Sequence, residues 1–127
     1  MTQGAYKTLA QWLDGRIASL RELEEQAREV IEQQGDQAGY ERLMREKALL
    51  LADLEEQGRD ILKEAGGPEA DKLRQRLAAF SAGASMALEV GSVFFMSALL
   101  YPEDHQPGQP NDLERFAEFA HQLAGSR

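Results

Sequence analysis

A narrow polar stripe runs along an otherwise apolar segment in the second half of the chain. Between Leu77 and Tyr101 the only charged residue is Glu89, and Ser85, Glu89 and Ser92 follow one another at steps of four and three. In a helix this spacing places the three side chains on one face. A carboxylate in apolar surroundings needs a partner, because an unpaired buried charge is very costly.

Lys47 is the partner that the sequence offers to Glu89, with a histidine or a metal ion as alternatives. It interrupts a seam in which Tyr40, Leu43, Leu50 and Leu54 recur at helical steps of three and four. We therefore predict a buried polar site made of Glu89, Ser85, Ser92 and Lys47. Such a site either holds the helices in register or serves binding or catalysis.

A second group with chemical potential is the pair Glu118 and His121 in "EFAH", three residues apart on one helical face. Over these four residues the chain resembles the carboxylate-bridged di-iron bundles, which use a Glu-x-x-His motif on each of two helices. His105 and His121 are the only histidines, so a full ligand set would require a second copy. The other interpretation of His121 is a side chain that stabilises a helix C-terminus.

The elements that must position these residues are all helices. Capping signals at Gly35 and Asp36, at Pro68, and at Asn111 separate the apolar periodic segments. We expect one all-α domain over 1–127. It begins with a heptad-patterned, coiled-coil-like hairpin at 6–65, whose arms are 6–34 and 36–65. A core helix at 68–100, a loop at 101–110 and a C-terminal helix at 111–124 follow. Asn111 and Glu114 are expected to form a capping box, and Glu24 and Arg28, four apart, to lie on the solvated outer face.

The apolar part of the predicted 68–100 helix has three interpretations. Residues 77–101 are long enough to span a bilayer, but the carboxylate and several serines make insertion break-even at best. The second is a core helix surrounded by other helices. The third is one wall of the polar site around Glu89. Small residues four apart suit close helix packing, so we predict a dimer interface at Gly83, Ala87, Gly91 and Phe94.

Composition limits the function classes. The net charge is −8 with no basic run, so we expect neither nucleic acid nor a membrane surface as partner. The absence of cysteine and of a secretion signal suits the cytoplasm. No phosphate-binding loop or nucleophile elbow is present.

The sequence favours a cytoplasmic helical interaction or assembly module without evident catalysis or cofactor. We expect it to form a homodimer, and another protein is a further candidate partner. One alternative is a metal protein or enzyme that binds a divalent ion near Glu89, His105 and His121, with Glu118 as a further ligand. The other is a membrane-associated protein.

Overall fold

The computed structural model describes residues 2–125, and these form helices joined by turns and one longer loop. The predicted all-α bundle is confirmed. The helices are α1 (Thr2–Glu32), α2 (Gln37–Ala52), α3 (Leu54–Ile61), α4 (Pro68–Val90), α5 (Val93–Ala98) and α6 (Asp112–Leu123).

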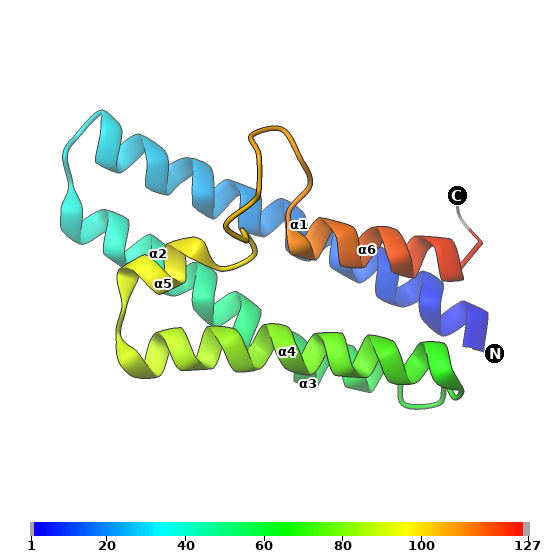
Figure 1. Ribbon diagram of the computed structural model, residues 1–127. Helices are drawn as coiled ribbons and strands as arrows, with labels where there is room; N and C mark the ends of the chain where they lie inside the picture. The colour runs from blue at the N-terminus through cyan, green and yellow to red at the C-terminus, as the bar shows by residue number, and fades with distance from the viewer. Residues whose placement is uncertain (1, 126–127) are drawn as a thin grey trace.

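The long helices lie side by side with alternating directions (Figure 1). The chain runs out along α1 and returns along α2 and α3, and α4 then runs in the direction of α1 while packing on both α2 and α3. The short α5 turns back against α2. The last helix, α6, packs on the N-terminal half of α1, so both ends of the described chain lie at the same end of the bundle. Among residues 2–125, no long fourth helix lies beside the C-terminal half of α1.

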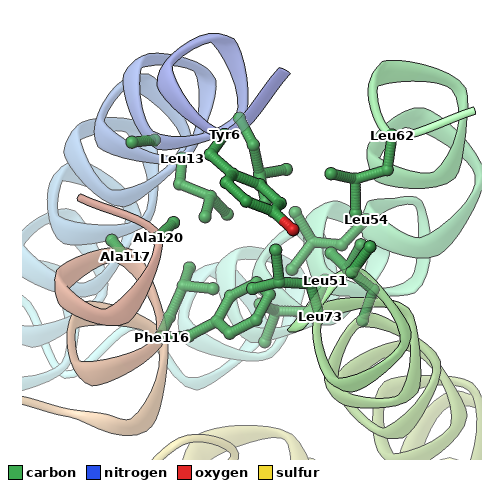
Figure 2. Packing of buried hydrophobic residues seen from close by; sticks show 14 of the residues in the cluster. Tyr6, Leu13, Leu51, Leu54, Leu62, Leu73, Phe116, Ala117 and Ala120 are labelled. Carbon is green, nitrogen blue, oxygen red and sulfur yellow. The ribbon is translucent and has the colours of Figure 1, made fainter. Parts of the chain in front are cut away.

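The core is divided into two apolar clusters. The larger one joins α1, α3, α4 and α6, and Figure 2 shows Tyr6, Leu13, Leu54, Leu73 and Phe116 pointing toward one another. The smaller one lies where α1 and α2 meet α5, and it consists of Ala27, Leu43, Met44, Ala48, Ala87 and Met96. Each cluster is covered by the apolar face of several helices, as hydrophobic burial requires.

The returning arm of the hairpin is not one helix, because it breaks at Asp53 between α2 and α3. A side chain from α4 satisfies the backbone there: the buried Ser81 hydroxyl donates to the carbonyl of Leu51 (3.0 Å) and accepts from the amide of Glu55 (2.9 Å). Just beyond the break, a Cβ atom added to Gly58 would lie 2.6 Å from a methyl carbon of Leu77. A larger residue at this position would therefore force the buried Leu77 side chain to move.

The prediction of one long third helix over 68–100 is wrong, because α4 ends at Val90. Gly91 adopts a left-handed conformation (φ 74°), and the amides of Gly91 and Ser92 both donate to the carbonyl of Ala87 (2.9 and 3.2 Å). Ser92 then caps α5 by accepting from the amide of Phe95 (3.0 Å). This reversal lets Met96 complete the smaller cluster. Within residues 2–125, no helix has both the length and the apolar character that a bilayer span requires.

The bridge at Ser81 yields a stability prediction. Replacing Ser81 with alanine leaves the Leu51 carbonyl and the Glu55 amide without their buried partner, so we expect a loss of about 1–3 kcal/mol in the free energy of unfolding. Ser85→Ala is the matched control, since Ser85 is exposed one turn along the same helix and its change should stay within about 0.5 kcal/mol. Urea denaturation measures both. Equal losses would contradict the bridging role.

Candidate functional site

The buried lysine that the sequence singled out lies at the centre of a polar cluster. The Lys47 side chain is 1% exposed on α2, and its Nζ atom lies 3.2 Å from Oε2 of Glu24. The same nitrogen donates to the carbonyl of Ser97 on α5 (3.0 Å) and lies 5.1 Å from the ring centroid of Tyr101. We name Lys47, Glu24, Ser97 and Tyr101 the Lys47 cluster. Its members come from α1, α2, α5 and the start of the long loop.

Tyr101 completes the cluster by binding the other oxygen of the carboxylate. Its hydroxyl donates to Oε1 of Glu24 at 2.8 Å. Glu24 therefore holds a cation on one oxygen and a phenol on the other, while its side chain keeps 19% exposure. A carboxylate held in this way is a fixed hydrogen-bond acceptor that still reaches solvent.

Burial shifts the proton affinities of two cluster members in opposite directions. Loss of solvent lowers the pKa of the Lys47 amine below its ordinary value of 10.5, and the nearby Glu24 carboxylate offsets only part of this effect. Burial also raises the pKa of the Tyr101 hydroxyl above 10.0, and its hydrogen bond to Glu24 acts in the same direction. The lysine is therefore easier to deprotonate than a surface lysine, and the tyrosine is harder to deprotonate.

The predicted buried site around Glu89 is not formed in this chain. Glu89 and Ser85 are exposed, and Ser92 is half-buried as the cap of α5. The inward face of α4 carries Ser81, Ala84 and Ala87, and Glu89 lies about 200° around the helix from Ala87. The expected pairing of Glu89 with Lys47 is therefore wrong, because the rotation of α4 turns the carboxylate outward and Glu24 of α1 takes its place.

A pocket of about 720 Å³ opens beside the Lys47 cluster, where α1 has no long fourth helix beside it. Its apolar lining is provided by Ala27, Ile31, Tyr40 and Met44, and Lys47, Glu24, Ser97 and Tyr101 complete the inner wall. The charged residues at the pocket are Arg21, Glu22, Glu25, Arg28 and Glu32. A cavity of this volume accommodates a small organic molecule.

Salt bridges organise the charged residues of this pocket. Arg28 pairs with Glu25 and lies 3.6 Å from Glu32, rather than pairing with Glu24 as its spacing suggested. Arg21 forms a bidentate contact with Glu114 of α6, with its nitrogens 2.6 to 3.0 Å from the carboxylate oxygens. Glu114 also forms the predicted capping box with Asn111, which is confirmed. This end of α6 is therefore fixed against α1.

The histidines lie apart from the Lys47 cluster and in different surroundings. His121 on α6 places Nε2 2.9 Å from a carboxylate oxygen of Asp14 on α1, and Glu118 lines the same small recess. His105 lies in the long loop, with Nε2 3.0 Å from the carbonyl of Gln109. Among residues 2–125, no three histidine or carboxylate side chains are grouped so that they could hold a metal ion. The structure thus does not bring His105 together with Glu118 and His121.

Sequence reasoning found Lys47 but missed Glu24, Ser97 and Tyr101. Glu24 was missed because it lies four residues before Arg28. An acidic and a basic residue at this spacing are typical of the solvated face of a helix. One signal was available, because a lysine at a core position demands a carboxylate from a facing helix, and Glu24 lies next to the apolar Leu23 on α1.

Comparison of the chain with protein-family models, with curated proteins and with solved structures gives no match. The fold and the site define the class as an all-α bundle that holds a buried lysine, in contact with a partly exposed glutamate and tyrosine, beside an open pocket.

Lys47 is fully buried and Glu24 is partly exposed, so substitutions of these two residues should lower the free energy of unfolding by different amounts. Glu24→Gln leaves a fully buried cation without its anion and should cost about 3 kcal/mol of unfolding free energy at pH 7. Lys47→Met leaves a carboxylate that keeps the Tyr101 hydroxyl and some water, so its cost should be nearer about 1 kcal/mol. Chemical denaturation of both variants tests this order, and a larger loss for Lys47→Met would contradict it.

The same pair predicts a pH dependence. The pKa of Lys47 is lower in the folded state than its ordinary value of 10.5, which applies to the unfolded chain. At a pH between the folded-state pKa and 10.5, the unfolded chain therefore binds more protons than the folded protein, and stability rises with pH. Removing the Glu24 carboxylate lowers the folded-state pKa of Lys47 further, so the pH range in which stability rises begins at a lower pH. The stability deficit of Glu24→Gln relative to wild type should therefore shrink as pH rises from 7 toward 10, as measured by denaturation at each pH. A deficit that grows over this range would contradict the assignment.

Proposed function

We propose that the protein is a helical interaction module that associates with a second copy of itself through the joint between α4 and α5. The observation that carries the proposal is a group of large apolar side chains on this joint that the chain leaves uncovered. Met86 and Val90 on α4 are 65% and 62% exposed, and Phe94 and Phe95 on α5 are 74% and 50% exposed. We name these four residues the α4–α5 patch.

The composition of the patch is typical of an interface. Its two phenylalanine rings lie 6.1 Å apart between centroids, and aromatic residues and methionine are enriched in the centres of protein interfaces. Large continuous apolar patches on soluble monomers commonly mark interaction sites. The surface is therefore better suited to a partner than to water.

The expected strength is moderate. If dimer formation buries these four side chains completely on both copies, the hydrophobic effect contributes on the order of 10 kcal/mol to the free energy of association. The loss of translational and rotational freedom on association costs about the same order. We therefore expect a dimer that depends on concentration and on contacts around the patch.

A second copy is the favoured partner because a two-fold axis places the patch against itself without a different protein. Gly83 and Gly91 are exposed next to the patch, and an added Cβ would meet nothing closer than 3.9 Å at either residue, so another helix can approach there. Ala87 no longer belongs to the proposed interface, since it is buried in the chain's own smaller cluster. The cytoplasmic location, suggested by the absence of cysteine, remains part of the proposal.

The proposal predicts a mass near twice 14.1 kDa at micromolar concentration, measured by sedimentation at moderate salt. Phe94→Glu introduces a charge that would be buried at the centre of the patch, so it should weaken association at least tenfold. Gln75→Glu adds the same charge to an exposed position on the same helix, about 22 Å before Val90, and should leave association unchanged. A monomeric wild type at these concentrations would overturn the proposal.

A further inference from the structure

One lysine differs from the others in its surroundings. The chain has four lysines, of which Lys7, Lys63 and Lys72 are exposed and Lys47 is buried. The buried one also borders the 720 Å³ pocket, whose lining includes Tyr40 and Met44, and its amine contacts the Glu24 carboxylate. Packing alone does not require this arrangement, because replacing a buried ion pair with apolar side chains of similar volume is often neutral or stabilising.

The neighbours of the amine supply the parts that carbonyl chemistry needs. Glu24 at 3.2 Å from Nζ can accept and return a proton, and its second oxygen is held by the Tyr101 hydroxyl at 2.8 Å. The partial exposure of Glu24 gives water a route to the carboxylate. Lys47 shares the lining of the pocket with the apolar residues Ala27, Ile31 and Met44, and the pocket volume accommodates the body of a small ligand.

We propose that this pocket binds a small aldehyde or ketone with an apolar body and holds it as a reversible imine on Nζ of Lys47. Burial of the amine supports this role, because the lowered pKa increases the fraction of neutral, nucleophilic lysine at a given pH. The proposal is independent of self-association, which involves the α4–α5 patch.

The reaction balances without an oxidant or a reductant. Glu24 takes a proton from the Lys47 ammonium, and the freed nitrogen pair attacks the carbonyl carbon. A C–N bond forms, the carbonyl electron pair moves to oxygen, and that oxygen takes the proton from Glu24. Glu24 then accepts a second proton from nitrogen and passes it to the hydroxyl, which leaves as water while the C=N bond forms.

The product fits the contacts of the cluster. A protonated imine carries one N–H group in place of the three of the ammonium, and Glu24 remains its acceptor. The hydrogen bond from Nζ to the Ser97 carbonyl is then given up. Tyr101 acts as a positioning residue, since its hydroxyl donates to the Glu24 carboxylate and holds it beside the amine.

The test traps the imine with benzaldehyde and sodium cyanoborohydride at pH 7, and peptide mass mapping gives the rate of modification at each lysine. We expect Lys47 to be benzylated at least tenfold faster than Lys7, Lys63 and Lys72 in the folded protein. In urea the four rates should become similar, because the pocket is lost. A buried lysine with only a structural role would instead react more slowly than the three exposed lysines, and this result would overturn the proposal.

Two matched variants show whether the adduct belongs to the site. Lys47→Met should abolish the fast phase of modification, whereas Lys63→Met, which removes an exposed lysine, should leave it unchanged. If Lys47→Met does not fold, the comparison among the four lysines of the wild type still decides the question. A fast phase that survives in folded Lys47→Met would also overturn the proposal.

Discussion

The burial of one positive charge is the constraint on which the rest of this structure depends. A lysine at 1% exposure requires hydrogen-bonding partners on every side, because an unpaired buried cation is very costly. The polar partners of Lys47 are the Glu24 carboxylate from α1 and the Ser97 carbonyl from α5, and the Tyr101 ring after α5 lies 5.1 Å from the amine. The chain can supply Ser97 and Tyr101 only if it reverses after α4, and the left-handed Gly91 provides that reversal.

The break between α2 and α3 follows the same physical rule. The interruption at Asp53 frees backbone groups, and the single hydroxyl of Ser81 satisfies two of them from the neighbouring helix. Polar atoms in this core therefore mark the places where regular helices end or change direction. Apolar contacts fill the space between them, while Ser81 and Lys47 determine how α4 and α5 meet α2.

The short helix α5 connects the two surfaces that we associate with function. Ser97 lines the pocket, Met96 is buried in the smaller cluster, and Phe94 and Phe95 lie on the exposed patch. The six residues of α5 thus present three different faces, to the pocket, to the core and to solvent. Any shift of α5 would change the carbonyl that Lys47 binds and the surface offered to a second copy.

The sequence by itself determined the helical class and several helix starts, because these depend on contacts within a few residues. Asp36 caps α2, Pro68 opens α4, and Asn111 with Glu114 forms the capping box of α6. Only the tertiary structure decided that Glu24 rather than Glu89 pairs with Lys47, and that the apolar segment breaks at Gly91. These outcomes depend on the rotation and approach of whole helices. Residues 23 positions apart therefore become partners, while the Glu89 carboxylate on α4 turns to solvent.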